Sequence, residues 1–492
     1  MRSTPFIRII RLVIPILLLA SLPVSIWAYP TVKDPGDPVD EANMRVHVQI
    51  ISVVGNKKTK PKVILRELTF SQGDSLVVKN LDEHIARSQQ NIYNLGLFNE
   101  VSIKHDVLEG SLFVFITVKE RWYIFPAPQI RVEERNSYDL IDAVLAGDFH
   151  RLSYGLKVGW RNITGNNEDL YFFGQSGFTQ RLALDYIRPG TFSNYTDLMI
   201  SIRYNRNDEI IYGTEEGRVL WGEVEDEVLQ ETQSYTLGVR HRFSLYKSLR
   251  GYIQYKDRRF SDSIYAFSER FLTNQRGREH YPSLVVQWVT DKRDLTTYPL
   301  DGHVFKVHFR HTGIPDVSST SFSKAGFSWS QYVPLSKKLF FAYGTQHTFT
   351  FGRDVPFFEK NVIGIGRTEF PGTSTNLRGY QPFAIDGSYV QLTKAELKFA
   401  VVPRKIIHIK QIPVKRFQDM PFGLYITAFM DNGYVQDETI SNQDTYLKNR
   451  WLTGYGLGVN IITIYDRLIR VELARNHLGQ NGIYFHSSLP IR

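Results

Sequence analysis

The chain has 492 residues, no cysteine and a formal net charge of +9. Without cysteine it can form no disulfide framework and no thiolate metal site, and it cannot be a lipid-anchored lipoprotein. Arg2, Arg8 and Arg11 belong to an N-terminal leader, and without these three the charge falls to +6, too small an excess to indicate nucleic-acid binding. Aromatic residues make up 13% of the chain, which is typical of membrane barrels with aromatic girdles but is also compatible with a soluble β-rich protein.

The leader places an apolar run, Leu12–Trp27, between the basic residues and the small residue Ala28. This order predicts a secretory signal peptide over residues 1–28; the alternative is a membrane anchor, for which the run is slightly short. Residues 29–44 are acidic and rich in proline, and they predict an extended linker. No later segment approaches the length of a membrane-spanning helix, which excludes a helical membrane protein.

Residues 45–120 have the pattern of a compact α+β domain. A strand is expected up to the Gly55-Asn56 turn, the Gly73-Asp74 turn separates two helical patterns, and Gly96 ends the second helix. The resulting order is β-α-α-β-β. Its expected elements are Arg45–Val54, Lys60–Thr69, Leu81–Leu95, Val101–Val107 and Leu112–Val118.

From residue 121 onward, apolar and polar residues alternate strictly in long segments. In His303–His311 the apolar side chains oppose Lys306, His308 and Arg310. Several charges on one face of a strand suit a barrel with a wet lumen and a lipid-facing exterior. About 370 residues, at roughly 20–25 for each strand with its connection, predict about 14 to 18 antiparallel strands. The same alternation occurs in Leu198–Asn205, Tyr235–Leu245, Lys394–Phe399 and Ile469–Leu473.

A glycine-punctuated loop contains the sequence Leu377-Arg378-Gly379-Tyr380. Arginine offers five donors in a planar fork, glycine allows a close backbone approach, and tyrosine adds a rigid ring with a polar tip. This combination suits a loop that folds into a lumen, although alone it is also compatible with a coincidental turn. On a later strand, Ile426 and Met430 share the apolar face, so alternation directs Phe429 and Asp431 toward the lumen.

Spaced motifs in the N-terminal domain resemble those of a POTRA domain, the periplasmic module of the BamA/TamA/FhaC outer-membrane assembly-factor superfamily. Leu97 and Phe98 would also serve as ordinary core residues that cap the second helix. The residues that match are Gly55, Asn56, Gly73, Asp74, Leu95, Gly96, Leu97, Phe98, Val101, Glu120 and Arg121.

The barrel region resembles the same superfamily at four further places. These are Asn162–Gly165 with Tyr186–Pro189, the Asp291–Gly302 turn, Glu369–Gly372 with Leu377–Tyr380, and the F-x-D-x-G motif at Phe429, Asp431 and Gly433. The chain departs from the family in three respects. It has one POTRA-like domain instead of several, Thr373 replaces a second loop glycine, and the C-terminal strand lacks a terminal aromatic residue.

The resemblance implies an α+β POTRA domain followed by an all-β transmembrane barrel of 16 antiparallel strands over residues 121–492. It also implies that the loop 364–387 lies in the lumen, where Arg378 pairs with Asp431. The implied function is non-enzymatic outer-membrane protein assembly, insertion or translocation, with the POTRA domain in the periplasm and no cofactor or metal. The implied partners are an unfolded outer-membrane or secreted client, outer-membrane lipid, and periplasmic chaperones or accessory subunits, without nucleic acid.

Prolines at the two ends of the barrel predict a weak seam. Pro126 and Pro128 fall in the first expected strand, Trp122–Val132, and Pro490 falls in the last, Ile483–Pro490. Proline cannot donate to a ladder and is tolerated at sheet edges. The client would bind by β-augmentation at the POTRA sheet and pass to this seam.

Two alternatives remain open from the sequence: a passive pore or structural barrel, and a barrel-embedded enzyme. The chain has no Gly-x-Ser-x-Gly elbow. Alternation sends His308 to the face opposite His303 and His311, so these histidines do not suit a metal triad. Pore-lining or girdle positions are the simpler interpretation.

Overall fold

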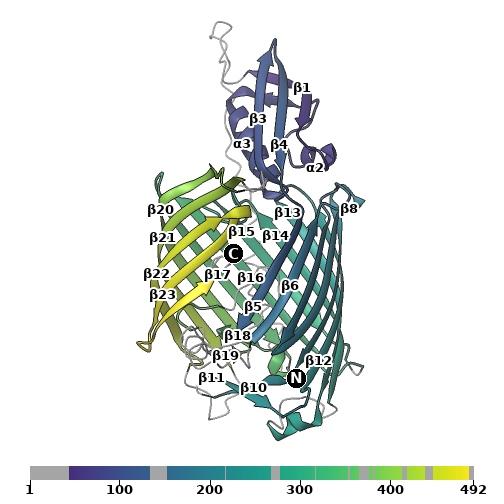
Figure 1. Cartoon of the computed structure of the whole chain (residues 1–492), viewed down its shortest axis with the longest axis vertical. Coiled ribbons are helices and arrows are strands. Elements are labelled where there is room, and N and C mark those ends of the chain that lie inside the picture. The colour runs from purple at the N-terminus through teal and green to yellow at the C-terminus, as the bar shows by residue number, and fades with distance from the viewer. Residues whose placement is uncertain are drawn as a thin grey trace, which may run out of the picture.

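The computed structural model describes residues 44–132, 152–215, 218–267, 277–315, 317–352, 355–364, 376–380, 383–412, 418–437 and 447–486. It consists of a small domain that stands at one end of a large barrel (Figure 1). We call this end of the barrel the domain-side end. The expected signal peptide, most of the linker, Thr373 and Pro490 lie outside the described residues.

The small domain is a mixed four-stranded sheet with helices against one face. Its sheet order is β2-β1-β4-β3, in which β1 and β4 run parallel and the other pairs antiparallel. Val63, Ile64 and Ile92 from the helices are fully buried against the sheet. The elements are β1 (Arg45–Val54), α2 (Pro61–Leu65), β2 (Ser75–Val77), η2 (Val78–Asn80), α3 (Leu81–Asn94), β3 (Phe98–Leu108) and β4 (Ser111–Glu120).

The first helix ends earlier than the sequence pattern predicts, at Leu65 instead of Thr69. The amides of Glu67 and Leu68 bond to the carbonyl groups three residues earlier, which tightens the chain out of the helix. This turn buries Leu68 in the domain core and lets the Glu67 carboxylate reach the barrel. The short strand β2 was not expected from the sequence.

The predicted turn glycines have structural reasons to be glycine. Gly55 has a φ of +91°, and a Cβ there would lie 2.0 Å from the carbonyl oxygen of Val118. Gly96, with a φ of +68°, ends α3. Between them, Asp74 Oδ2 accepts a 2.7 Å hydrogen bond from the Ser71 amide, and the Gly73 amide donates to the Val48 carbonyl.

The described strands between Ile124 and His486 include a 16-stranded antiparallel sheet, which confirms the predicted fold class. Apart from the outermost strands β5 and β24, each strand pairs with the barrel strands before and after it, so the chain passes up and down around the barrel (Figure 1). The strands are β5 (Ile124–Val132), β6 (Leu152–Arg161), β7 (Asp169–Gly177), β8 (Thr179–Ser193), β9 (Thr196–Asn207), β12 (Gln230–Arg242), β13 (Lys247–Phe260), β14 (Arg278–Asp291), β15 (Gly302–Thr312), β16 (Phe322–Pro334), β17 (Leu339–Phe351), β20 (Tyr389–His408), β21 (Asp419–Gln436), β22 (Trp451–Thr463), β23 (Arg467–Asn476) and β24 (Asn481–His486).

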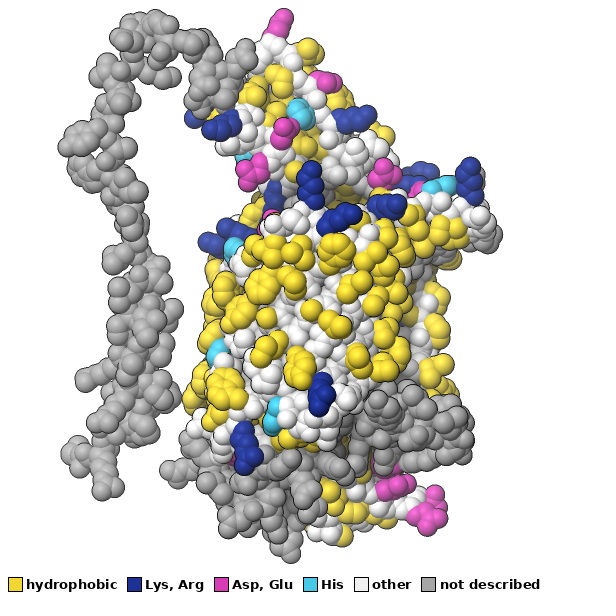
Figure 2. Space-filling view, turned by 90° about the vertical axis from the view of Figure 1, so that its left-hand side faces the viewer, with side chains coloured by type: hydrophobic (Ala, Val, Ile, Leu, Met, Phe, Trp, Pro, Cys, Tyr) yellow, Lys and Arg dark blue, Asp and Glu magenta, His cyan; other side chains and the backbone are white. Residues whose placement is uncertain are grey.

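Alternation along the strands produces an apolar exterior and a charged lumen. On β21, Ile426 and Met430 are 49% and 51% exposed, whereas Thr427 and Asp431 are buried. Apolar side chains cover the flank of the barrel, and lysines and arginines gather near the domain-side rim (Figure 2). In the part of the chain that the structure describes, no helix is long and apolar enough to cross a membrane.

The sheet ends at β5 and β24. Pro126 and Pro128 lie opposite Val158 and Leu156 of β6, and β24 pairs with β23. Within residues 124–132 and 481–486, no backbone ladder joins β5 to β24. β5 and β24 are therefore the two outermost strands of the sheet.

Shorter elements lie between the barrel strands. The loop from β17 to β20 contains η4 (Phe357–Glu359) and a hairpin of β18 (Asn361–Gly364) and β19 (Ala384–Gly387), so it begins well before the predicted residue 364. The β18–β19 hairpin lies toward the end of the barrel away from the domain (Figure 1). The remaining elements are β10 (Glu209–Glu215), β11 (Arg218–Glu223), η3 (Asp262–Ala266) and η5 (Ile464–Asp466).

Candidate functional site

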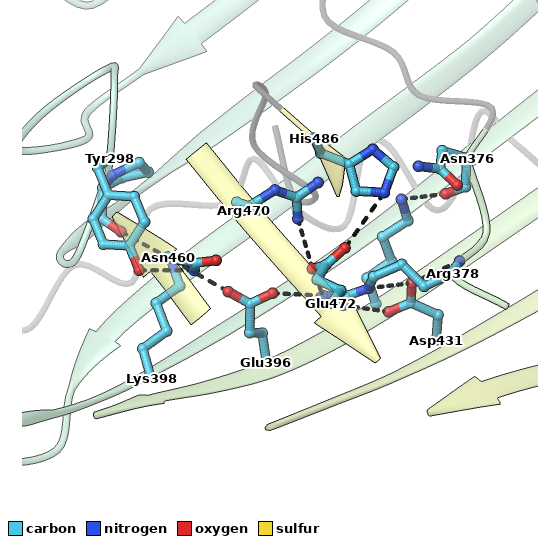
Figure 3. Close-up of polar contacts among 12 residues, drawn as sticks. Tyr298, Asn376, Arg378, Glu396, Lys398, Asp431, Asn460, Arg470, Glu472 and His486 are labelled. Carbon is cyan, nitrogen blue, oxygen red and sulfur yellow. Dashed lines mark hydrogen bonds and ion pairs between the residues drawn. The ribbon is translucent and has the colours of Figure 1, made fainter. Parts of the chain in front are cut away.

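The side chain of Arg378 lies inside the barrel, 1% exposed, among three carboxylates (Figure 3). Asp431 binds it in a bidentate manner, with Oδ2 2.7 Å from Nε and Oδ1 2.6 Å from Nη2. Nη1 donates to Glu396 at 2.7 Å and to Glu472 at 3.2 Å. The guanidinium carbon also lies 3.7 Å from the centre of the Phe429 ring. We call Arg378, Asp431, Glu396 and Glu472 the acidic cage.

The carboxylates of the acidic cage come from β20, β21 and β23, whose lumen faces alternate with lipid-facing residues. Sequence reasoning placed Asp431 in the lumen but did not identify Glu396 or Glu472 as partners of Arg378. Both residues lie on the polar faces of predicted strands, so alternation could have marked them as candidates. Glu396 and Glu472 are far apart in the sequence, so the sequence alone does not show that both contact Arg378.

Three further cations lie beside the acidic cage. Arg470 Nη1 is 2.9 Å from Glu472, and Lys398 Nζ is 4.0 Å from Glu396. Lys394 donates to the carbonyl oxygen of Asn376, two residues before Arg378, at 2.5 Å. The charges at this wall of the lumen are therefore nearly balanced.

Backbone packing holds the arginine in place. Gly379 has a φ of +89°, a region that favours glycine. The Gly379 carbonyl accepts a 3.0 Å hydrogen bond from Asn476, and the hydroxyl of the buried Tyr380 donates to the Thr453 carbonyl at 3.3 Å. A Cβ on Gly454 of β22 would lie 1.9 Å from the carbonyl oxygen of Arg378. The loop and the barrel wall thus touch backbone to backbone.

Leu377 and Gly433 complete the contact between the loop and the wall. Leu377 is fully buried in an apolar cluster with Ile363 of β18 and Leu392 of β20. A Cβ on Gly433 would approach the side chains of Ile363 and Leu377 to 2.9 Å. The predicted loop motif and the predicted F-x-D-x-G motif therefore lie together in one packed unit.

The same loop has a second buried anchor, which sequence reasoning missed. Lys256 and Arg258 of β13 each lie 3.1 Å from Glu359 Oε1, and Arg310 of β15 lies 3.8 Å from Oε2. Tyr281 of β14 donates to Oε1 at 2.6 Å, and Lys324 of β16 donates to the Glu359 carbonyl. We call these residues the basic cage. No sequence motif marks Glu359. Its ion pairs depend on which barrel strands face the loop, and the local sequence does not contain that information.

A third cluster joins the small domain to the barrel around Asp466, in the turn between β22 and β23. Oδ2 accepts from Tyr93 at 2.7 Å and from Arg121 at 2.8 Å, and Oδ1 accepts from Arg404 at 2.7 Å. Burial alone would raise the pKa of Asp466, but Arg404 and Arg121 outweigh it and lower the pKa below its usual value. Burial, with Asp466 nearby, raises the pKa of Tyr93 to about 12, so its phenol remains a donor.

Contacts on other sides of the barrel fix the same domain. Arg242 pairs with Glu67 at 2.9 Å, and Asn162 donates to Thr59 at 2.9 Å. Beside the Asp466 cluster, the ring of Tyr465 packs edge-on against Phe125 of β5, with centroids 4.8 Å apart. The small domain therefore bridges several turns at the domain-side rim, including one that contacts the first barrel strand.

The histidines of β15 do not come together. His308 is buried in the lumen, whereas His303 and His311 are partly exposed on the opposite face. Within the described residues, no group of three His, Asp or Glu side chains could hold a metal ion.

The protein is thus a 16-stranded barrel with a small α+β domain at one end and an arginine-bearing loop inside. The model of the Omp85 superfamily domain matches residues 162–474, and the chain belongs to this superfamily. A second model, the POTRA model described as the surface antigen variable number repeat, matches residues 46–121, which cover all but the first residue of the small domain.

Individual relatives resemble parts of the chain. The outer membrane protein assembly factor BamA of Neorickettsia risticii is 35% identical over 78 residues, which are 16% of this chain and 10% of that protein. The structure of CdiB from Escherichia coli has a TM-score of 0.55 at 13% identity, with 90% of this chain and 76% of that chain covered. CdiB from Acinetobacter baumannii has a TM-score of 0.50 at 13% identity, covering 91% and 74%. These two structures support the fold.

Proposed function

We propose that the protein is a non-enzymatic factor of the bacterial outer membrane that inserts or translocates unfolded client proteins. The POTRA domain, residues 45–120, stands in the periplasm, and residues 121–492 form the membrane barrel. The observation that carries this proposal is that β5 and β24 are the two outermost strands of the sheet, with no ladder between their described residues. Superfamily membership supports it.

The client first binds the edge of the POTRA sheet. β3 is the outermost strand on one side of that sheet and runs for 11 residues. An extended client can add a strand to such an edge through main-chain hydrogen bonds, which makes binding tolerant of client sequence. Val107 and Leu108 at the end of β3 are 42% and 63% exposed and offer apolar contacts. Chaperones or accessory subunits would deliver the client to this edge.

The client then passes to the seam. Pro126 and Pro128 remove two donors from β5, one of the two outermost strands of the sheet. Each missing ladder bond forfeits roughly 0.5–1.5 kcal/mol, so a seam between these strands opens more easily than the rest of the sheet. A client strand that pairs with the freed edge would enter the lipid sideways.

The seam is tested by cross-linking. One cysteine on β5 and one on β24 should form a disulfide under oxidation and stop client assembly, and reduction should restore it. The matched control places the two cysteines at Ala127 and Lys157, which are already paired on the neighbouring strands β5 and β6. Normal client assembly with the β5–β24 pair fully locked would refute the lateral route.

The POTRA domain is tested by deletion of residues 45–119. The truncated barrel should remain folded but should no longer assemble clients. Depletion of the intact protein, followed by proteomics of the outer membrane, should identify the clients as the proteins whose abundance falls. Wild-type assembly by the truncated protein would refute client capture by this domain. A passive pore would instead require large, steady conductance, which the side chains packed across the lumen disfavour.

A further inference from the structure

The turn between β14 and β15, residues 292–301, folds into the barrel instead of following its rim. Tyr298 at its tip is 2% exposed. The Tyr298 hydroxyl accepts a 3.0 Å hydrogen bond from Asn460 of β22, and the Tyr298 ring lies 4.5 Å from Lys398 Nζ of β20 (Figure 3). In the sheet order, β16, β17, β20 and β21 separate β15 from β22. The turn therefore extends into the lumen and contacts the wall up to five strands away from β15 in the sheet order.

Apolar and polar contacts seat the turn on that wall. The Tyr298 ring packs against Tyr425 with centroids 4.8 Å apart, and both belong to an apolar cluster with Ile462 and Leu468. The carbonyl of Pro299 accepts a 3.4 Å hydrogen bond from Lys398. Lys398 also pairs with Glu396, which in turn binds Arg378, so this ion pair on β20 links the turn to the Arg378 loop.

The POTRA domain holds the turn from the other side. Asn94, the last residue of α3, donates through Nδ2 to the Asp294 carbonyl at 2.9 Å and accepts through Oδ1 from the Thr296 amide at 3.2 Å. The domain stands directly over this end of the barrel (Figure 1). If the domain moved away, these two backbone groups would lose their partners.

We propose that residues 292–301 are a plug that closes the domain-side end of the lumen and that Asn94 of the POTRA domain keeps the plug seated. The plug is bonded on one side to the barrel wall and on the other to a separately folded domain. Displacement of that domain therefore favours release of the plug. Entry to the lumen from the domain side is coupled in this way to the position of the POTRA domain, whether or not a client is present.

The test uses the full chain with one reporter cysteine, because the natural sequence contains none. Thr427 is suitable because it faces the lumen on β21, is 1% exposed and lies next to Tyr425 in the polar face. A membrane-impermeant maleimide is added to proteoliposomes with the POTRA domain outside. Thr427→Cys should label slowly, Asn94→Ala should increase the rate by about fivefold or more, and Tyr298→Ala should increase it further.

Matched controls separate plug release from general loosening. Gln89→Ala removes an exposed amide from the same helix and should leave the rate unchanged. Reagent enclosed on the opposite side should report any route past the Arg378 loop, and that rate should not respond to Asn94→Ala. Unchanged labelling from the domain side in both Asn94→Ala and Tyr298→Ala, with the barrel folded, would overturn the proposal. Because no client is present, this failure is distinct from failure of the proposed assembly function.

Discussion

The two buried anchors of the β17–β20 loop use opposite charges. In the acidic cage, the loop supplies a cation, Arg378, and the barrel wall supplies three carboxylates. In the basic cage, the loop supplies a carboxylate, Glu359, and the wall supplies the cations. The loop thus binds two charged walls of one lumen, and exchanging its two anchors would place like charges together.

The cages differ in what remains when the loop residue is removed. Without Arg378, three carboxylates remain beside Lys394, Lys398 and Arg470, so their charges balance. Without Glu359, four cations remain together, and the buried Glu279 opposite Arg258 is the nearest acid in the strand register. Uncompensated buried charge is costly. Glu359, the anchor without a family motif, is therefore expected to contribute more to stability than Arg378.

The largest effect is therefore expected at Glu359. Glu359→Gln should lower the free energy of unfolding by about 3–5 kcal/mol, because the wall cations lose the carboxylate on which they converge. Urea unfolding of the barrel in lipid vesicles measures this loss. Glu225→Gln, at an exposed loop position, is the control. Adding Lys324→Met to Glu359→Gln should recover part of the loss, and a loss below that of Arg378→Ala would reverse the comparison.

Arg378→Ala should have the next largest effect, about 1.5–3 kcal/mol on the placement of the loop, and should impair function without unfolding the barrel. Asp431→Ala should have a similar but smaller effect, because Glu396 and Glu472 still hold the arginine. The double mutant should be little worse than Arg378→Ala. Proteolysis of the loop from the far end of the barrel and client assembly measure these effects; fully additive losses would show that the pair is not energetically coupled.

Gly454→Ala should push the loop away from the acidic cage without changing any charge, because the new methyl group would overlap the Arg378 carbonyl. Overpacking of this kind costs about 1–3 kcal/mol. Gly251→Ala on β13 is the matched control, since a Cβ there meets no atom within 4 Å. Faster proteolysis of the loop in Gly454→Ala but not in Gly251→Ala would sharpen the comparison; equal rates would contradict the close backbone contact.

The smallest effect is expected from pH, at the cluster that joins the POTRA domain to the barrel. The pKa of Asp466 is lowered in the folded protein, so its contribution is present above the usual carboxyl pKa and is lost as pH falls through the lowered value. Docking of the domain should therefore be constant from about pH 8 to 5 and weaken below about pH 4. Distances between spin labels on the domain and the barrel measure this; release near pH 6 would contradict the assignment.

The sequence alone determined the faces of the strands. Side-chain direction alternates with a period of two residues, which is a local property, so Asp431 and Phe429 could be assigned to the lumen before any contact was known. The turns at Gly55 and Gly73 and the end of α3 at Gly96 also follow from local backbone requirements. The α+β domain and the antiparallel barrel could be predicted for the same reason. The number of 16 strands came from the family resemblance.

Only the tertiary structure decided which lumen residues meet. Glu396 and Glu472 come together with Arg378, and four cations surround Glu359, because the sheet closes around the loop and brings distant strands face to face. The same closure brings Tyr298 to Asn460 across the barrel. Such contacts depend on the strand stagger and curvature of the whole barrel. The two-residue alternation along a single strand contains no information about either. The sequence therefore predicts that a charge faces inward, whereas the barrel geometry selects its partner.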